Sequence, residues 1–440
     1  MSSYDSNTQA NPDVVVIGGG IAGMAASIHL ARAGLQVTCI EANEVKSEPV
    51  GESLDWSAPD LLRELGLPME RLLGEGIATY KRHIILKLRN GTEHEYIPGE
   101  WLSKPPYNVE LDTLHVDRGR LNAAVRAIML ESGVRVVTAR INAIEAEGRR
   151  VRRLHTAEGR PIEARWYIDA SGSKSCLLPR HFRLPFVEYG PHKVAIWNYF
   201  KAESYVPGTT LHAFSPQGGY MEWIWKIPIR SDVVGVGYVA PGESIREQRR
   251  AGESVQAIYD RQRESFTGLR ELGEQEWQEA ARTTSFRCKV CTNLAGPNWI
   301  VIGEAAAMVD PMTSNGVTAA LRQAGESARL IIAHRNRARI SALAARVYSW
   351  RVTSVARFFN CGIERIVYEW PVRARIGIVR AGDAYTIPAW VMNVVYSRLR
   401  PKGLIKTALL ASILFLLRAG FNLLSWYCRN TTSSDTVCAT

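Results

Sequence analysis

Three glycines spaced as in a phosphate-binding turn stand near the start of the chain. Gly18, Gly20 and Gly23 follow an apolar run at residues 14–17 and open an Ala-rich helical pattern. In such a turn the first glycine permits the tight bend, the second lets the backbone approach a pyrophosphate, and the third lets helix and strand pack closely. The free N–H groups and the dipole at the helix start favour the anion. This segment therefore predicts a dinucleotide site.

Glu41 is the acidic residue that such a turn requires. It ends the second apolar run, residues 36–40, at about the interval from Gly18 that places a carboxylate on a ribose hydroxyl. With Ile21 and Ala22, which open the helix, it completes the predicted cofactor contacts of this unit. The unit alone does not distinguish FAD from NAD.

Two later apolar runs end on similar turns. They deliver Asp169-Ala170-Ser171-Gly172 and Gly303-Glu304, and a further turn at Asp310-Pro311 precedes another helical pattern. Between them, residues 182–239 are rich in aromatic and alternating apolar residues, which is typical of a sheet with one covered face. The fold class is therefore predicted to be α/β, with an inserted β-rich domain.

Four consecutive segments are expected. Residues 1–181 form the first part of a Rossmann-like nucleotide-binding domain, and residues 182–285 form the β-rich substrate domain. Residues 286–330 return to the nucleotide-binding domain, and residues 331–440 form a basic, apolar, helical C-terminal region. The length of 440 residues and the 46% hydrophobic content suit two or three domains with a large core.

The N-terminus and the cysteines indicate a cytoplasmic protein. Residues 1–12 are polar and lack the apolar stretch of a signal peptide. The seven cysteines are odd in number and scattered, unlike a disulfide framework.

The basic excess of the chain is concentrated in one region. The net charge is +11, and residues 335–406 alone hold 14 Lys and Arg against three Asp and Glu, a charge of +11. This asymmetry favours an anionic partner, either a membrane surface or an acidic carrier protein, and we expect no nucleic acid. A solvated basic helical face is the alternative.

The end of this region is strongly apolar. Residues 407–428 are 22 residues interrupted only by Arg418, long enough to span a bilayer. Ten Leu, Ile or Phe contribute about −0.3 to −0.6 kcal/mol each to insertion, whereas a central Arg costs about 2.5 to 3.5 kcal/mol. The balance favours an interfacial or re-entrant helix on the inner face of the membrane, through residues 335–428. A helix packed against the body of the protein remains the alternative.

Taken together, these segments resemble the FAD-dependent monooxygenase superfamily, which has a p-hydroxybenzoate hydroxylase-like fold, and within it the tryptophan halogenase-like flavin-dependent halogenases. The resemblance covers residues 13–330 and rests on the glycine-rich turn, Gly51-Glu52-Ser53, the segment around Arg118 and the two later turns. It implies that the cofactor is FAD. The further FAD contacts that it implies are Arg118, Asp169, Gly172, Gly303, Glu304, Asn315, Gly316 and Val317.

The halogenase assignment depends chiefly on Trp223-Ile224-Trp225-Lys226-Ile227-Pro228, which is similar to the WxWxIP motif of these enzymes. The resemblance implies that Trp223 and Trp225 keep the flavin from oxygenating the substrate directly. It further implies FADH2, O2 and chloride or bromide as reactants, with hypohalous acid formed from a flavin C4a-hydroperoxide. A separate NAD(P)H flavin reductase is the implied partner, because no second GxGxxG is present.

A lysine that holds the hypohalous acid against an electron-rich carbon is also implied. Lys81, on the extended stretch after Gly51-Glu52-Ser53, is the candidate, and Lys87 is the competitor. An ammonium suits this role because it donates a hydrogen bond to the departing oxygen. The halide is expected on backbone N–H groups near Ser314, at a helix start.

Three positions depart from the family pattern. Asn315 stands where Thr or Ser is common, and Glu304 where Asp contacts the ribityl chain. Thr313 replaces the Glu of tryptophan-specific members, which favours a phenol, a pyrrole or another activated ring, carrier-bound or lipophilic.

Cys288 and Cys291 form a CxxC without a second pair, so no metal is expected.

Two other functional classes remain open. The first is a membrane-associated FAD-dependent monooxygenase or a geranylgeranyl reductase-like oxidoreductase, since those relatives share the same turns. The second is a flavoprotein without catalytic activity.

Overall fold

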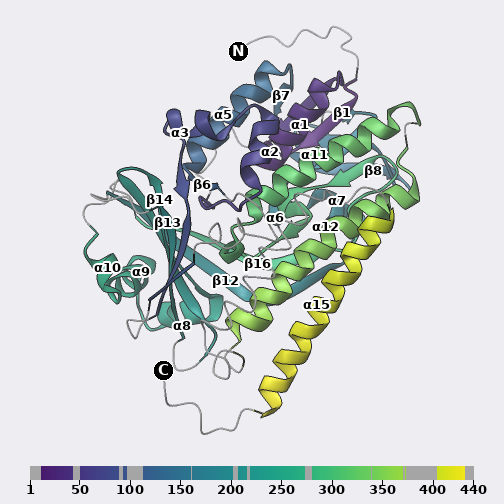
Figure 1. Ribbon diagram of the computed structural model, residues 1–440. Coiled ribbons are helices and arrows are strands. Elements are labelled where there is room, and N and C mark those ends of the chain that lie inside the picture. Colours follow the sequence, from purple (N-terminus) through teal and green to yellow (C-terminus); the bar gives the residue numbers. More distant parts are fainter. Residues whose placement is uncertain are drawn as a thin grey trace, which may run out of the picture.

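The computed structural model describes most of the chain, in two β-sheet layers flanked by helices (Figure 1). The described residues are 11–42, 50–88, 93–96, 112–159, 161–201, 207–215, 219–272, 280–337, 339–369, 372 and 404–431.

A five-stranded parallel sheet carries the glycine-rich turn, in the order β17-β11-β1-β2-β7. Its strands are β1 (Val14–Ile17), β2 (Val37–Glu41), β7 (Arg135–Thr138), β11 (Trp166–Asp169) and β17 (Trp299–Val301). Helix α1 (Ile21–Arg32) connects β1 to β2 and packs against α5 (Arg118–Glu131) and α11 (Gly316–His334). Parallel strands joined by helical crossovers are the Rossmann-like arrangement. The predicted α/β fold class is therefore confirmed.

The larger sheet has eight strands in the order β18-β16-β12-β15-β14-β13-β4-β5. They are β4 (His83–Leu88), β5 (Glu93–Tyr96), β12 (Phe186–Lys201), β13 (Gly208–Phe214), β14 (Glu222–Arg230), β15 (Val233–Pro241), β16 (Arg282–Cys291) and β18 (Ala307–Met308). This sheet does not follow the predicted segment boundaries, because β4 pairs with β13 and β16 pairs with β12. Pairing between distant strands leaves no local sequence pattern that would reveal it.

Smaller elements join the two sheets. The additional strands are β3 (Ala78–Lys81), β6 (Thr113–Val116), β8 (Ile141–Glu147), β9 (Arg150–Thr156) and β10 (Pro161–Glu163). The short helices are α2 (Ala58–Leu65), α3 (Met69–Gly74), α6 (Gly172–Ser175), α7 (Leu177–His181), α8 (Gly242–Arg250), α9 (Val255–Glu264) and α10 (Thr267–Arg270), with 3-10 turns η2 (Gly303–Ala305), η3 (Pro311–Thr313) and η4 (Arg335–Arg337).

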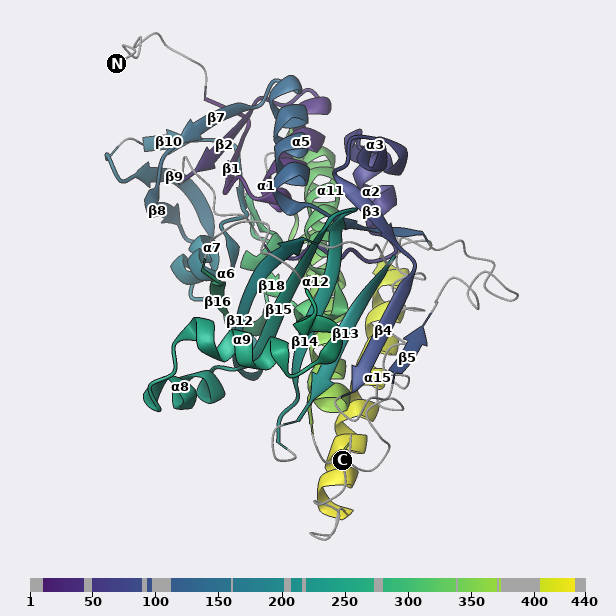
Figure 2. The ribbon, with the colours of Figure 1, turned by 90° about the vertical axis from the view of Figure 1, so that its left-hand side faces the viewer.

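Different helices cover the two faces of the eight-stranded sheet (Figure 2). One face packs against α8, α9 and α10. The other packs against α12 (Ala342–Gly362), the π-helix η5 (Ile363–Tyr368) and α15 (Leu404–Thr431). Alternating side chains of each strand therefore enter two separate apolar cores.

Helix α15 has two unlike sides. It lies along α12, and Leu410, Leu414 and Phe421 are buried against the protein. Its outer side exposes Ile405, Leu409, Leu416, Leu423 and Trp426. In the described part of the chain it is the one helix that is long and apolar enough to cross a membrane. Much of the predicted basic region, residues 370–371 and 373–403, lies outside the described residues.

Candidate active site

The glycine-rich turn has the geometry that its sequence predicts. Gly18 has a φ of 103°, in the left-handed region that favours glycine, and an added Cβ would collide with the carbonyl oxygen of Ala170. A Cβ on Gly23 would collide with the carbonyl oxygen of Gly18, so this glycine lets α1 approach β1. Both glycines are required for close packing inside the protein.

Gly20 differs from these two because space is open beside it. A Cβ on Gly20 would meet nothing within 4 Å, so the backbone at the start of α1 is accessible to a ligand. From the end of β2, a carboxylate oxygen of Glu41 accepts a 2.7 Å hydrogen bond from the Gly19 amide. Ile21 and Ala22 are buried in the first turn of α1. This cradle, with its free helix start and nearby carboxylate, fits a dinucleotide.

Arg118 and Glu304, two further predicted FAD contacts, lie near each other. Arg118 donates from Nη1 to the carbonyl oxygens of Gly51 (3.0 Å) and Val50 (3.3 Å). Burial lowers the pKa of Arg118, and the nearby carboxylates of Glu52 and Glu304 act against that shift. Glu304 is exposed and accepts a 2.9 Å bond from the Ser173 hydroxyl. Its longer side chain is therefore accommodated beside α6.

Asp169 is committed to the protein itself. Its two carboxylate oxygens accept from the backbone amides of Ser171 (3.0 Å) and Leu178 (2.7 Å). Gly172 and Gly303 both have positive φ angles, 81° and 62°. The geometry gives Asp169 a role in shaping the turn, and its predicted contact with FAD stays a prediction.

Lys81 lies where β3 ends, immediately before the chain enters the large sheet. Its side chain is 3% exposed, and Nζ donates a 2.9 Å hydrogen bond to the carbonyl oxygen of Leu54. The ammonium lies 5.3 Å from the ring centre of Trp56. Burial lowers the pKa of Lys81 to about 8, and the negative charge of Asp55 acts against that shift. The Lys81 ammonium therefore releases its proton more readily than the ammonium of an exposed lysine.

Lys87, the competing lysine, has a different environment. Its Nζ pairs with Glu93 at 2.9 Å, and its side chain is 38% exposed. An exposed ion pair of this kind is a common surface feature and contributes little to the free energy of folding. Of the two candidate lysines, Lys81 is therefore the buried one, and its catalytic role stays a prediction.

The loop from Asp310 to Gly316 leads into α11, and it is here called the halide loop because the predicted halide position lies on it. Ser314 has a φ of 55°, and its hydroxyl donates to the Ser53 hydroxyl at 3.0 Å. The Asn315 amide donates to a carboxylate oxygen of Asp55 at 2.6 Å. Gly316 opens the helix and Val317 is buried in its first turn. The loop is thus tied to the segment that follows Gly51.

Lys81 and the halide loop are connected through one short segment. Leu54 accepts from Lys81, Asp55 accepts from Asn315, and Trp56 lies under the Lys81 ammonium. His115, on β6 opposite β3, bonds Thr209 at 2.9 Å and is fully buried. Burial and the nearby Lys81 charge hold the pKa of His115 well below its usual value, so the ring is neutral. No sequence pattern predicted Asp55, Trp56, His115 or Thr209, because only strand pairing and packing bring them to Lys81.

Trp223 and Trp225 lie on the face of β14 that packs toward the helical layer. Both are buried, with ring centres 5.7 Å apart. The Trp223 indole donates to the Tyr368 hydroxyl at 2.8 Å, whereas the Trp225 indole nitrogen has no hydrogen-bond partner in the described part of the chain. A Cβ on Gly237 would collide with the Trp225 ring, so this glycine makes room for the indole. Their predicted role toward the flavin remains a prediction.

Glu222, which precedes the tryptophans, faces the other way. Its carboxylate accepts from the hydroxyls of Tyr238 and, at 2.9 Å, Ser244. A carboxylate with two donors is compatible with burial.

The CxxC cysteines enter different cores. Cys288 packs between the large sheet and the helical layer, whereas Cys291 packs with the nucleotide-binding core. Within the described ranges, no cluster of three or more His, Cys, Asp or Glu could hold a metal.

The sequence matches two protein-family models. The model described as tryptophan halogenase matches residues 106–353, which is more than half of the chain. The chain belongs to the tryptophan halogenase family. A lycopene cyclase model also matches residues 13–189, where the glycine-rich turn lies.

Individual relatives of the chain are distant in sequence. The tryptophan 2-halogenase of Chondromyces crocatus is 28% identical over 326 residues, covering 71% of this chain and 59% of that protein. The menaquinone reductase of Mycobacterium tuberculosis is 30% identical over 335 residues, covering 72% of this chain and 76% of that protein. The chain thus matches about three-fifths of the length of the halogenases to which it is similar.

Solved structures show the same fold. A triple mutant of the flavin-dependent brominase Bmp2 superimposes with a TM-score of 0.71 at 21% identity, covering 95% of this chain and all of that one. The Rossmann-like sheet with a β-rich second layer is therefore shared.

Proposed function

We propose that the protein is an FADH2-dependent halogenase that uses a halide and O2 to halogenate an electron-rich ring. The observation that carries the proposal is Lys81, a buried amine with a lowered pKa, held by Leu54 next to the Asp55–Asn315 contact with the halide loop. A solvated lysine paired with a carboxylate would be neither buried nor lowered in pKa by burial. Family membership supports the same assignment.

FAD is the cofactor in this proposal. Gly20 and the start of α1 would hold the pyrophosphate, Glu41 would take the ribose, and Arg118 with Glu304 would lie beside the remainder. Reduced flavin would supply the oxidising equivalents from O2 that convert halide into hypohalous acid. A separate NAD(P)H flavin reductase would provide the reduced form.

Lys81 would then guide the oxidant. Its ammonium would donate a hydrogen bond to the oxygen of hypohalous acid and polarise the O–halogen bond. As the halogen bonds to carbon, the O–halogen bond breaks, the ring loses the proton of that carbon, and the oxygen leaves as water. The Leu54 carbonyl keeps Nζ in one position, and the neutral His115 beside it adds no competing positive charge. Ser314 would line the halide site at the start of α11.

The substrate would be a phenol, a pyrrole or a similar activated ring, lipophilic or carrier-bound. Thr313 supplies no carboxylate to pair with the amino group of free tryptophan. Its hydroxyl instead donates to the Asp310 carbonyl oxygen at 2.8 Å.

The test combines the protein with FAD, a flavin reductase, NADH and bromide on a panel of electron-rich arenes. Mass spectrometry should show brominated product. Hydroxylated product without bromine would contradict the proposal. As a check on the cofactor, Gly20→Val should fold but lose flavin, since space beside Gly20 is open in the protein and would be needed by the pyrophosphate.

A flavin-dependent reductase or hydroxylase acting on a lipophilic substrate is the second candidate. It is favoured by the relative named menaquinone reductase, whose identity of 30% exceeds that of the tryptophan 2-halogenase. Direct NAD(P)H oxidation by the purified protein, without a reductase, would support this function over halogenation.

We also propose that the outer side of α15 contacts the anionic inner face of a membrane. Ile405 and Leu416 are 84% and 67% exposed, and Trp426 stands near the far end. Lys406 and Arg429 are exposed near the two ends of the helix. Apolar residues with aromatic and basic flanks suit an interfacial helix.

Flotation with vesicles that contain phosphatidylglycerol tests this contact. The full chain should float, and Ile405→Glu with Leu416→Glu should reduce flotation. Equal flotation of both proteins would contradict the membrane proposal.

A further inference from the structure

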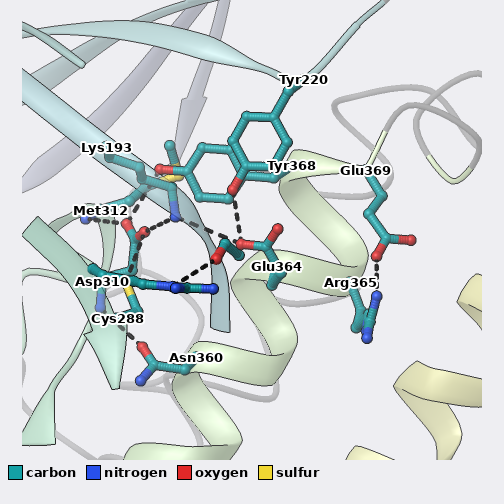
Figure 3. Close-up of polar contacts among 12 residues, drawn as sticks. Lys193, Tyr220, Cys288, Asp310, Met312, Asn360, Glu364, Arg365, Tyr368 and Glu369 are labelled. Atoms are coloured by element: carbon teal, nitrogen blue, oxygen red, sulfur yellow. Dashed lines mark hydrogen bonds and ion pairs between the residues drawn. The ribbon is translucent and has the colours of Figure 1, made fainter. Parts of the chain in front are cut away.

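A second buried charged cluster lies at the other end of the halide loop from Lys81 (Figure 3). Lys193 on β12 is 1% exposed, and its Nζ lies 3.1 Å from Asp310 and 3.5 Å from Glu364. The rings of Tyr368 and Tyr220 lie 4.3 and 5.6 Å from the ammonium and stack on each other at 4.6 Å. A buried cation enclosed by carboxylates and aromatic faces has little freedom to move.

Asp310, four residues before Ser314, is fully engaged in this cluster. Its partners are Lys193 Nζ (3.1 Å) and Cys288 Sγ (3.5 Å) on one oxygen, the Met312 amide (3.1 Å) and the Tyr368 hydroxyl (3.3 Å) on the other, and Asn360 Oδ1 (3.0 Å) on its backbone N–H. The start of the halide loop is therefore held by both its side chain and its backbone.

Several of these contacts come from the helical layer. Asn360, Glu364 and Tyr368 follow one another at intervals of four along the end of α12 and η5, and all three face the cluster (Figure 3). Asn360 also donates to the Met308 carbonyl oxygen at 3.0 Å, and Tyr220 donates to Glu364 at 2.7 Å. π-helical turns inside α-helices are frequent at functional sites.

The same cluster reaches the tryptophan motif. Tyr368 accepts from the Trp223 indole at 2.8 Å and donates to Asp310. One side chain thus connects the strand that carries Trp223 to the halide loop. These helical residues lie beyond residue 353, where the family match ends.

We propose that Lys193, with the α12–η5 layer, positions the halide loop from behind and thereby sets the affinity of the loop for halide. The inference rests on the proposed function, since it takes residues 310–316 as the halide site. Lys193 and Glu364 act through Asp310, so they are positioning residues. Lys81 and the segment 54–56 hold the other end of the same loop.

A matched pair of substitutions, one in η5 and one immediately after it, tests the proposal. Glu364 faces Lys193, whereas Glu369, one turn on, faces α15 and accepts from Ser425 at 2.6 Å and from Arg429 (Figure 3). Glu364→Gln, within η5, and Glu369→Gln, at the residue that follows η5, make the same chemical change toward two different neighbours.

Two measurements are compared for the FAD-bound proteins. In Glu364→Gln, amide hydrogen exchange of residues 310–316 should be roughly tenfold faster, because the loop opens more readily. The KM for bromide should rise roughly tenfold, with kcat and FAD affinity unchanged. Glu369→Gln should change neither measurement.

Equal exchange of the loop in the two variants would overturn the proposal. If Glu364→Gln does not fold, Tyr220→Phe removes only the hydroxyl that bonds Glu364 and should accelerate exchange severalfold; unchanged exchange there would also overturn it. Faster exchange in a protein whose wild type brominates nothing would refute the proposed function and leave the positioning inference standing. If the wild type brominates but loop exchange is the same in the two variants, the proposed function stands and the positioning inference is refuted.

Discussion

Two buried lysines differ in what surrounds them. Lys81 and Lys193 are 3% and 1% exposed. Lys81 bonds a backbone carbonyl oxygen and lies over an indole, so burial lowers its pKa to about 8. For Lys193, burial acts in the same direction, but Asp310 and Glu364 outweigh it and raise the pKa. The charges within reach, and not the depth of burial, separate a titratable amine from a permanently charged anchor.

The largest expected effect removes the titratable lysine. Lys81→Met should lower bromination by about 10²- to 10⁴-fold, the usual contribution of a positioned proton donor, with FAD still bound. Brominated product per reduced flavin measures the loss. Lys87→Met is the matched control and should keep full activity because the Lys87 side chain is 38% exposed and pairs with Glu93 at the surface. Full activity in Lys81→Met would remove it from the mechanism.

For the free energy of unfolding, we expect the larger loss when Lys193 is replaced and the smaller loss when Lys81 is replaced. Lys193→Met leaves Asp310 and Glu364 without their cation, which should lower the free energy of unfolding by about 3–5 kcal/mol. Lys81→Met should have a smaller effect, because the desolvation cost of the ammonium disappears with it. Urea unfolding of both variants gives the comparison. Equal losses would mean that the two sites are not electrostatically distinct.

Alkaline pH provides a third comparison. The folded pKa of Lys81, about 8, lies below the ordinary lysine pKa of 10.5, so the unfolded chain binds this proton more tightly. Wild type should therefore gain stability relative to Lys81→Met as pH rises from about 8 to 10.5, by about 1.4 kcal/mol per unit. For Lys193 the effect of pH on stability has the opposite sign, because its folded pKa is raised. The stability that its charge contributes should be lost only when the pH rises above the pKa of the unfolded chain. Urea unfolding at several pH values measures the slope, and parallel curves would contradict the lowered pKa.

The smallest effect concerns Asp55, whose charge acts against the lowered pKa of Lys81. Asp55→Asn keeps an oxygen for Asn315 but removes that charge, so the pKa of Lys81 should fall further. The alkaline limb of kcat/KM for bromination should move to lower pH, with a roughly severalfold loss at pH 8. An unmoved limb would show that Asp55 does not influence the amine.

Much of the fold could be predicted because its signals are local. The glycine turn, the acidic end of β2 and the alternating strand around Trp223 each depend on residues close in sequence. The eight-stranded sheet could not be divided correctly, because β4 and β16 find their partners far along the chain. The apolar C-terminal helix was recognised, but its packing along α12 depends on a surface that the segment itself does not encode.

The sequence by itself determined the chemistry available to this protein: a dinucleotide turn, a tryptophan-rich strand, two candidate lysines and a helix start for an anion. Only the tertiary structure decided how these groups are used. It buried Lys81 and exposed Lys87, placed Asp55 opposite Asn315, and assembled Lys193, Asp310 and Glu364 from three distant segments. The reason is physical, since a pKa and a hydrogen bond depend on distances and water exclusion that arise only after the chain has folded.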